Sequence, residues 1–364
     1  MISKLKNMIF QMMAGANVAT VIIMLLIGYS DRVNPQSFHL FANAGLAYPV
    51  FLIFNLLFLI FWCFVKIRWV VIPLLGFVFG FLPTRNYCPI NLTDDTAKSN
   101  LKVLSYNVWG FGYFGHGDDD YSIPAYIAEQ GADIVCLQEA GEASLANKEI
   151  QDTIFPLYQY RDTLKKENSG DVLAFYSKYP ILKKERIPFE SRGNIAGAVW
   201  LNVDGDTVIV VNAHFETTGL DADDKAHFKH MVKGDYATDS VETTSKLLYT
   251  KLKEATLKRA PQAEAVAEFI ANHRGTTMIC CGDFNDGPNS YTHQTIANKL
   301  TDCYVTAGNG PGISYHKGGF YVRIDNIFCS TDLEPLKCIV DNKIATSDHY
   351  PIICWLKRGE MLKK

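Results

Sequence analysis

The chain has 364 residues, 48% of them hydrophobic, and a formal net charge of −3 at pH 7. Its first 90 residues hold a single acidic side chain, Asp31, so the acidic residues gather in the remainder of the chain. An acidic domain is a poor electrostatic partner for a phosphate polyanion, which counts against tight nonspecific binding of DNA.

Three apolar segments occupy these first 90 residues. Phe10–Tyr29 and Leu46–Val65 carry no charge, and each matches the roughly 20 residues that a helix needs to cross a bilayer. A cleaved signal peptide is the alternative for the first segment, and the apolar segments that follow argue against it. The third, Trp69–Leu82, is short and interrupted by Pro73 and two glycines, so a re-entrant or interfacial segment is the alternative to a third crossing.

Basic residues near these segments predict the orientation. Lys4 and Lys6 precede the first segment, and Lys66 and Arg68 lie between the second and third. Basic loops favour the cytoplasmic side, and three crossings then place the rest of the chain outside the cytoplasm. If the third segment does not cross, that domain lies inside. We expect a multi-pass membrane protein with its soluble domain on the extracytoplasmic side.

The composition divides the chain into four parts. We predict a membrane region over residues 1–90, a polar linker over 91–100, a soluble domain over 101–358 and a tail over 359–364. Helices are expected at Tyr121–Gln130 and Glu142–Ile154, and Asp204-Gly205-Asp206 predicts a β-hairpin. The polar insertion from Phe215 to about Ala260 is interpreted as a solvated face, with a lid or substrate-recognition arm as the alternative.

Several apolar runs of the soluble domain end abruptly in polar side chains. In layered α/β folds, chemistry lies where strands open into loops, so we expect these side chains to converge. Four strand-like runs and two later polar clusters deliver the set Asn107, Glu139, His214, Asp283 with Asn285, Asp325, and Asp348 with His349.

This set is enough for a divalent metal and an acid/base pair. The oxygen ligands of Asn107, Glu139 and Asp348 suit Mg²⁺ or Mn²⁺, with water and a substrate phosphate completing the shell. His214 and His349 can contact phosphate or carry protons, because imidazole titrates near neutrality. A carboxylate near His349 would fix its tautomer and hold its protonated form, and we expect Asp325 in that position.

Six motifs resemble, in order, those of the endonuclease/exonuclease/phosphatase superfamily, which includes deoxyribonuclease I and neutral sphingomyelinases. The motifs are SYNVWG, DIVCLQEA, VNAHFE, CCGDFNDGP, RIDN and SDHYPI, within about Leu101 to Leu356. The resemblance implies an α/β fold, a four-layer αββα sandwich with two central mixed β-sheets. It also implies a metal-dependent phosphodiesterase or phosphatase site at one edge of that sandwich.

The resemblance also implies roles for the residues in the motifs. Asp283 would orient or activate water, Asn285 would contact the phosphate, and His349, paired with Asp325, would touch the scissile phosphate. His214 would be the second catalytic imidazole. The residues assigned to the metal are Asn107, Glu139 and Asp348. The RIDN motif departs from many relatives, which have an aromatic residue where this chain has Asn326.

The sequence therefore predicts a membrane-anchored, Mg²⁺-dependent hydrolase of phosphoric esters, with Mn²⁺ as the alternative metal. Tethering places the enzyme beside membrane substrates, so a phospholipid or sphingolipid head group is the favoured substrate. A membrane-anchored nuclease similar to deoxyribonuclease I is the first alternative. A catalytically inactive binding protein of the same fold is the second. The oligomeric state is not predicted.

Overall fold

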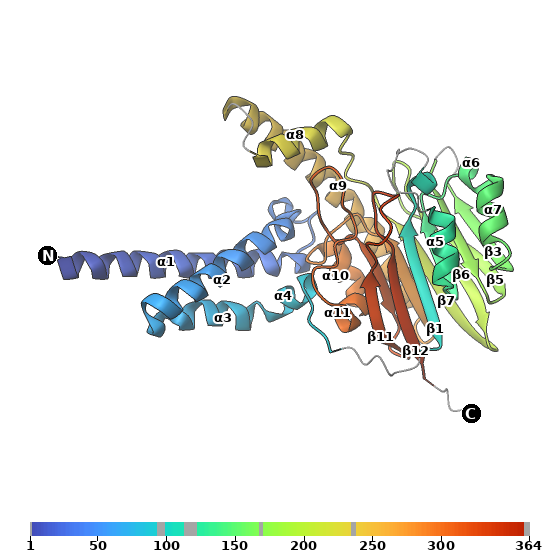
Figure 1. Cartoon of the computed structure of the whole chain (residues 1–364), viewed down its shortest axis with the longest axis horizontal. Coiled ribbons are helices and arrows are strands. Elements are labelled where there is room, and N and C mark those ends of the chain that lie inside the picture. Colours follow the sequence, from blue (N-terminus) through green and yellow to red (C-terminus); the bar gives the residue numbers. More distant parts are fainter. Residues whose placement is uncertain (1, 93–98, 113–121, 167–169, 234–237, 360–364) are drawn as a thin grey trace.

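The computed structural model describes residues 2–92, 99–112, 122–166, 170–233 and 238–359. Figure 1 shows a β-sandwich from one side of which a group of helices projects, all of them before residue 90. Most of the predicted linker over 91–100 and all of the predicted tail after Gly359 lie outside the described residues, as does Tyr121 at the start of a predicted helix.

The N-terminal region is helical and apolar. Two of its helices, Lys4–Arg32 and Ala44–Val65, are long and apolar enough to cross a membrane. The third predicted segment is bent by 64° between Ile67–Phe79 and Phe81–Tyr87, which gives up to three crossings if the bent pair forms one span. The α-helices of this region are α1 (Ile2–Gly28), α2 (Tyr48–Val65), α3 (Val71–Phe79) and α4 (Phe81–Tyr87).

Two six-stranded sheets form the centre of the sandwich, in the orders β11-β12-β1-β2-β4-β3 and β5-β6-β7-β8-β10-β9. The pairs β1–β2 and β7–β8 are parallel and the neighbouring pairs are antiparallel, so both sheets are mixed. The first sheet contains β1 (Leu101–Asn107), β2 (Ile134–Gln138), β3 (Tyr160–Lys165), β4 (Val172–Ser177), β11 (Leu333–Val340) and β12 (Ile352–Arg358). The second contains β5 (Ile181–Ile187), β6 (Ala196–Val203), β7 (Asp206–His214), β8 (Thr277–Asp283), β9 (Thr301–Asp302) and β10 (Asp325–Cys329).

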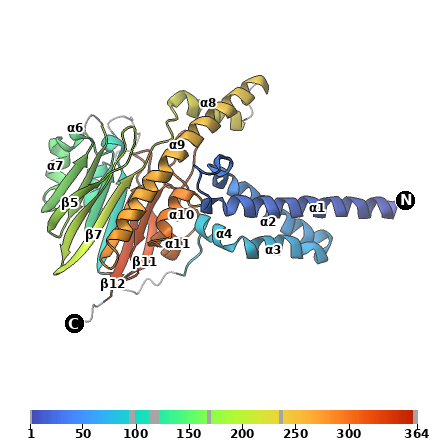
Figure 2. The ribbon, with the colours of Figure 1, turned by 180° about the vertical axis from the view of Figure 1, so that it is seen from behind.

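Helices cover the outer faces of both sheets (Figures 1 and 2). Helices α5 (Ile123–Gln130), α6 (Glu142–Leu145) and α7 (Lys148–Ile154) lie on the first sheet, and α9 (Thr238–Asn272) and α10 (Tyr291–Ala297) on the second. The remaining helices are α8 (Ala222–Lys233) and α11 (Cys303–Ala307). One apolar core fills the space between the sheets. A second lies between the first sheet and its helices, and a third between the second sheet and its helices. Burying both faces of each sheet explains why the central strands are apolar throughout.

The segment between α1 and α2, residues 29–47, is here called the connector, and it packs against the sandwich. Pro261 inside α9 has no N–H, so the Leu257 carbonyl lacks its helical partner. The Gln36 side chain of the connector donates to that carbonyl at 3.3 Å. At Gly45 an added Cβ would clash with the carbonyl oxygen of Asn289. The connector contains three short 3₁₀ helices, η1 (Ser30–Arg32), η2 (His39–Phe41) and η3 (Ala44–Ala47).

The predicted sandwich with two mixed sheets is confirmed. The predicted hairpin is also present between β6 and β7, where Asp204 and Gly205 both have positive φ, as this tight turn requires. The prediction of one helix over Glu142–Ile154 is wrong, because this segment forms two helices, α6 and α7. The Asn147 side chain accepts from the backbone N–H of Glu149 and so caps the start of α7. The insertion after Phe215 forms α8 and the first half of α9.

Candidate active site

Strand pairing brings the predicted side chains to one edge of the sandwich. His214 pairs with Asp283 across the parallel strands β7 and β8, and Asp325 pairs with the same Asp283 across β8 and β10. In the other sheet Asn107 pairs with Gln138, so Glu139 follows directly at the end of β2. The two sheets therefore present their polar strand ends to each other.

Asn107 links the two sheets. Its amide nitrogen donates to Oε1 of Glu139 and to Oδ2 of Asp283, each at 3.0 Å. Its amide oxygen accepts from the backbone N–H of Trp109. Asn107 therefore holds two carboxylates close to one point while its own oxygen faces the backbone.

Glu139, whose side chain is 33% exposed, and the buried Asp283 share this donor. Burial raises the pKa of Glu139 and of Asp283. Glu139 also has a φ of +52°, a conformation that costs an L-residue roughly 1–3 kcal/mol and is found most often at functional sites. Two neighbouring carboxylates with raised pKa, one buried and one half-buried, are an arrangement that a bound cation would stabilise.

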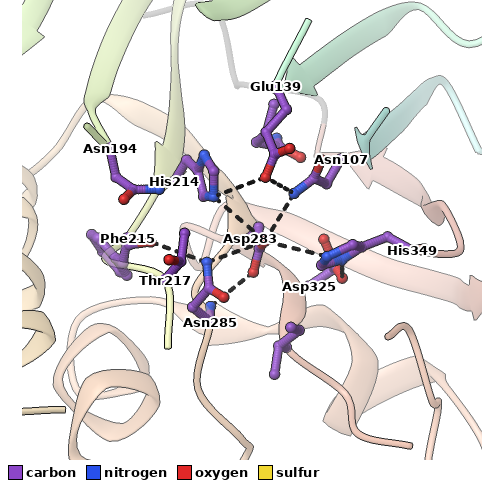
Figure 3. Close-up of polar contacts among 12 residues, drawn as sticks. Asn107, Glu139, Asn194, His214, Phe215, Thr217, Asp283, Asn285, Asp325 and His349 are labelled. Carbon is purple, nitrogen blue, oxygen red and sulfur yellow. Dashed lines mark hydrogen bonds and ion pairs between the residues drawn. The ribbon is translucent and has the colours of Figure 1, made fainter. Parts of the chain in front are cut away.

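His214 lies on one side of Asp283 (Figure 3). Its Nδ1 donates to Oδ2 of Asp171 at 2.9 Å, and its Nε2 lies 3.6 Å from Glu139 and 3.7 Å from Asp283. Burial alone would lower the pKa of His214, but the carboxylates of Asp171, Asp283 and Glu139 raise it to about 10. The ring is therefore protonated at neutral pH. Among the described residues its buried Nε2 has no hydrogen-bond partner, and this atom lies next to the carboxylates of Glu139 and Asp283.

His349 lies on the opposite side of Asp283. Its Nδ1 donates to Oδ2 of Asp325 at 2.8 Å, and its Nε2 lies 3.6 Å from Oδ2 of Asp283. Burial would lower the pKa of His349, and the carboxylates of Asp325 and Asp283 raise it to about 10. The Ser347 hydroxyl, which donates to the Asn107 carbonyl at 2.7 Å, fixes the loop that carries this imidazole.

Asn285 follows the central carboxylate in the loop after β8. Its amide nitrogen donates to the Phe215 carbonyl at 3.0 Å and to Oδ2 of Asp283 at 3.3 Å. Like Glu139 it has a φ of +52°, which asparagine tolerates better than most residues. The side chain of Asn285 is thus held at the floor of the site, below Asp283 in Figure 3.

These residues line a cleft of about 240 Å³, here called the catalytic cleft. Glu139, Asp283, Asn285, Asp348 and His349 all contribute to its wall. The residues predicted from the motifs are therefore brought together, with Asp325 and His214 directly behind the wall through their contacts to His349 and Asp283.

Asp171 is a site residue that sequence reasoning missed. It stands immediately before β4, after residues 167–169, which lie outside the described part of the chain. A Gly170-Asp171 pair in such a position has the composition of an ordinary turn, so the sequence offers no signal for it. The antiparallel pairing of β4 with β2 carries Asp171 to the strand-end edge, where it meets His214.

The donor set fits a hard divalent cation. Asp283, Asp325 and His349 offer ligand atoms that all lie within 4.8 Å of one another. The Asp325–His349 hydrogen bond already engages one oxygen and one nitrogen of that group. Glu139 adds carboxylate oxygens beside Asp283 of this group, so the residues present fit a divalent cation.

A sequence profile of the endonuclease/exonuclease/phosphatase family matches residues 104–349, more than half of the chain. The chain belongs to the endonuclease/exonuclease/phosphatase family. It is accordingly a metal-dependent hydrolase acting on phosphoric ester bonds. A second profile, a domain of unknown function, matches residues 10–87, the helical region. No curated protein matches the chain.

Solved structures resemble the family domain of this chain at low identity. TDP2 from D. rerio, humanized by 14 mutations, has 16% identity over 71% of this chain and 98% of its own, with a TM-score of 0.49. A sphingomyelinase C from Streptomyces griseocarneus has 17% identity over 71% and 99%, with a TM-score of 0.48. A mannosyl-6-phosphatase from Bacteroides thetaiotaomicron has 16% identity over 71% and 99%, with a TM-score of 0.47. Similarities this low carry no argument about substrate.

Proposed function

We propose that this protein is a membrane-anchored, Mg²⁺-dependent hydrolase that cleaves a phosphoric ester in the head group of a membrane lipid. The observation that carries the proposal is the position of Asp283, which lies within 3.7 Å of the Nε2 atoms of two carboxylate-paired imidazoles and shares a donor with Glu139. This is an arrangement that can hold a phosphoryl group and activate water beside it.

In the proposed reaction, water attacks phosphorus in line with the leaving oxygen. A new P–O bond forms to the water oxygen and the P–O bond to the leaving alcohol breaks. Asp283 accepts the proton of the water, which its raised pKa favours. His214 and His349, both protonated, donate their Nε2–H groups to phosphoryl oxygens, and the departing alkoxide takes a proton from solvent.

The cation would be held by Glu139 and Asp348, with Asn107 keeping the Glu139 carboxylate in place through its amide nitrogen. When bound, Mg²⁺ supplies Lewis-acid withdrawal of charge from the phosphoryl oxygens. Asn285, fixed by the Phe215 carbonyl, lies where its amide can contact the phosphate. These roles are the ones that the motifs imply, except that Asn107, which the motifs assign to the metal, here orients Glu139 while its amide oxygen accepts from Trp109.

The anchoring part of the proposal rests on α1 and α2, with the bent α3–α4 pair as a third crossing. Lys6 and Lys66 lie 5.8 Å and 4.9 Å from the same Phe10 ring, so the start of α1 and the α2–α3 turn share the end of the bundle that points away from the sandwich (Figure 1). With the basic end in the cytoplasm, the catalytic domain over 101–358 lies outside. Residues 1–90 then form the membrane region and 91–100 the linker.

A lipid substrate follows from this placement, because the catalytic domain is tethered beside the bilayer. An anchored nuclease needs a basic groove for the phosphate backbone, whereas the acidic residues of this chain gather in the soluble domain. Arg259, a cation in the wall of the catalytic cleft, is already paired with Asp286 at 3.3 Å. Neither feature favours DNA.

The proposal is tested on the full-length chain in detergent micelles. The panel contains bis(para-nitrophenyl) phosphate, para-nitrophenyl phosphate, vesicles of sphingomyelin or phosphatidylglycerol, and plasmid DNA, each with Mg²⁺, Mn²⁺ or a chelator. We expect Mg²⁺-dependent cleavage of an ester and faster turnover of a lipid than of DNA. Preferential cleavage of plasmid DNA would replace the proposal with the nuclease.

Two variants separate an enzyme from a binding protein of the same fold. Asp283→Ala and His349→Ala should each lower kcat/KM by about 10²–10⁴-fold. Matched controls are Asp162→Ala on β3 and His273→Ala after α9, both remote from the catalytic cleft, and they should retain wild-type rates. Equal rates in all four variants would contradict catalysis at this site.

A further inference from the structure

A second cavity of about 160 Å³ lies beside the catalytic cleft, between the connector and the loop after β8, and is here called the connector cavity. The two spaces share five lining residues, so they are adjacent. The shared residues are Asn43, Leu46, Asp286, Gly287 and Val322. Two of the five belong to the connector, which therefore forms part of the wall around the reacting centre.

Hydrogen bonds hold the connector in that position. The Thr256 hydroxyl is hydrogen-bonded to the Asn43 side-chain amide at 2.8 Å and accepts from Arg259 at 2.7 Å. Arg259 in turn pairs with Asp286, the neighbour of Asn285. A buried chain of contacts thus runs from the connector to the catalytic loop, so the wall is a fixed part of the site.

The connector cavity lies at the membrane end of the molecule. Leu46 belongs to the stretch Ala44–Val65 that is able to cross a bilayer, and Pro49, in the first turn of α2, also lines the cavity. Val33 and Phe41 add apolar wall from the connector, and Ile313 adds it from the sandwich. Leu46 is 45% exposed, so the opening of the cavity carries an apolar side chain where the bilayer surface would be.

Two buried oxygen atoms in the same cavity lack partners. Oδ1 of Asp31 and Oδ1 of Asn289 have no hydrogen bond among the described residues, although each residue is only 4% exposed. Leaving a buried acceptor unpaired costs about 1–3 kcal/mol. Both atoms would be satisfied by a ligand that brings a hydroxyl or amide N–H next to its apolar part.

We propose that the connector cavity binds the apolar chain, and the donor-bearing backbone next to it, of a membrane phosphoester whose phosphate lies at Asp283. The inference rests on the proposed function and gives its substrate class, an amphiphile with a hydroxyl or amide near the phosphate. The chain enters from the bilayer past Leu46, which makes the connector a specificity-determining element of the enzyme.

The test uses alkyl phosphates as competitive inhibitors of bis(para-nitrophenyl) phosphate hydrolysis by the full-length chain with Mg²⁺. An alkyl phosphate would bind with its phosphate at the metal centre, and its single alkyl chain could extend either into the connector cavity or away from it. For butyl, hexyl, octyl and decyl phosphate we expect the inhibition constant to fall about two- to fourfold per methylene group that enters the cavity. A hydroxyl on the second carbon of octyl phosphate should tighten inhibition by a further three- to tenfold or so.

Variants of Leu46 assign this effect to the cavity. Leu46→Trp fills the opening and Leu46→Glu charges it, so both should flatten the dependence on chain length. Leu157→Trp is the matched control, because Leu157 is 44% exposed in the turn after α7, remote from both cavities, and it should keep the wild-type dependence. Partition of the chains into detergent is common to all variants and cancels in this comparison. The thermal shift with Mg²⁺ verifies that each variant is folded.

The outcomes separate the inference from the function beneath it. A chain-length dependence that is lost in both Leu46 variants and kept in Leu157→Trp supports the connector cavity. A flat wild-type series, or the same slope in every variant, overturns it while the hydrolase stands. No gain from the hydroxyl overturns the assignment of Asp31 and Asn289. If no ester is cleaved with Mg²⁺, the proposed function fails and the inference falls with it.

Discussion

Each of the two imidazoles in the site has its pKa raised by a carboxylate that is hydrogen-bonded to its Nδ1. His214 depends on Asp171 and His349 on Asp325, and both pairs are closed at the Nδ1 atom. The Nε2 atoms of both rings are thereby left to face Asp283. At the residue scale the site is therefore a carboxylate between two oriented cations, and removing either orienting carboxylate should disable one of them.

The first prediction concerns Asp171, whose removal leaves His214 in place without its partner. Asp171→Asn should lower kcat/KM about a hundredfold and move the pH profile, because the pKa of His214 falls when the carboxylate is lost. Steady-state rates from pH 5 to pH 10 or so measure both effects. Asp162→Asn on β3 is the control. An unchanged profile in Asp171→Asn would show that this carboxylate does not set the state of His214.

The second prediction concerns stability against pH in the metal-free protein. The pKa of His349 is about 10 in the folded state and near 6.5 in an unfolded chain, so its pairing stabilises the fold below about pH 6.5 and is lost as the pH rises through 10. His349→Gln should therefore unfold several degrees below wild type at pH 6, and this gap should close towards pH 10. Thermal scans in chelator measure the gap. His273→Gln is the control. A difference in unfolding temperature between His349→Gln and wild type that does not change from pH 6 to pH 10 would contradict the pairing of His349 with Asp325.

At the scale of elements, the strands that carry the site could be predicted from sequence. β1, β2 and β8 are buried on both faces, so each is an apolar run that ends at a polar side chain. The edge strands could not. In β3 the exposure alternates, and β5 is mostly exposed and charged, so neither differs locally from a loop. Their pairing with β4 and β6 decides their conformation.

The residues of the site also fall into those that could be predicted from sequence and those that could not. The motif residues were predictable because each lies at or within a few residues of one end of a buried strand, in the order that the family shares. Asp171 was not, since only the pairing of β4 places it beside His214. The position of Leu46 in the wall of the catalytic cleft was not predictable either. It depends on contacts between the connector and residues more than 200 positions away in sequence, such as the hydrogen bond between Asn43 and Thr256.

The third prediction concerns the end of α4, where Arg323 binds the N-terminal helical region to the sandwich. Its guanidinium is 2% exposed and donates to the carbonyls of Asn86, Tyr87 and Pro311. Arg323→Ala would leave these carbonyls without their charged donor, at a cost of about 2–4 kcal/mol. The melting temperature of the full-length chain should fall by several degrees.

Arg186→Ala on β5, an exposed arginine of the same sheet, provides the comparison for Arg323. It should unfold at the wild-type temperature, because no buried carbonyl depends on it. If both variants melt together with wild type, the junction between α4 and the sandwich contributes nothing measurable, and the connector alone would have to hold the two parts in place.

At the scale of the whole molecule, the N-terminal helical region is joined to the sandwich at several points. Asn34 donates to Glu264 of α9 at 2.9 Å, and Asn289 donates to the Pro83 carbonyl of α4 at 3.1 Å. Asn43 and Leu46 of the connector line the catalytic cleft, so the cleft lies where the N-terminal helices meet the sandwich. Orientation in the bilayer then decides which compartment the active site faces.

The last prediction places that site outside the cytoplasm. The start of α1 and the α2–α3 turn carry Lys4, Lys6, Lys66 and Arg68 at the end remote from the sandwich, and such basic ends stay in the cytoplasm. Alkaline phosphatase fused to the C-terminus should be active, and a green fluorescent protein fused there should be dark. The same reporters inserted after Arg68 should show the reverse, as the internal control.

This result would also fix the number of crossings. An outside C-terminus with an inside α2–α3 turn requires the bent α3–α4 pair to traverse the bilayer, in spite of its 64° bend. A fluorescent C-terminus together with a fluorescent turn would mean that the pair returns to the side it came from. The active site would then face cytoplasmic lipid, and the connector cavity, which lies at the opposite end of α2 from that turn, would be on the wrong side of the membrane for the sandwich that it joins. The geometry of the connector therefore favours three crossings over two.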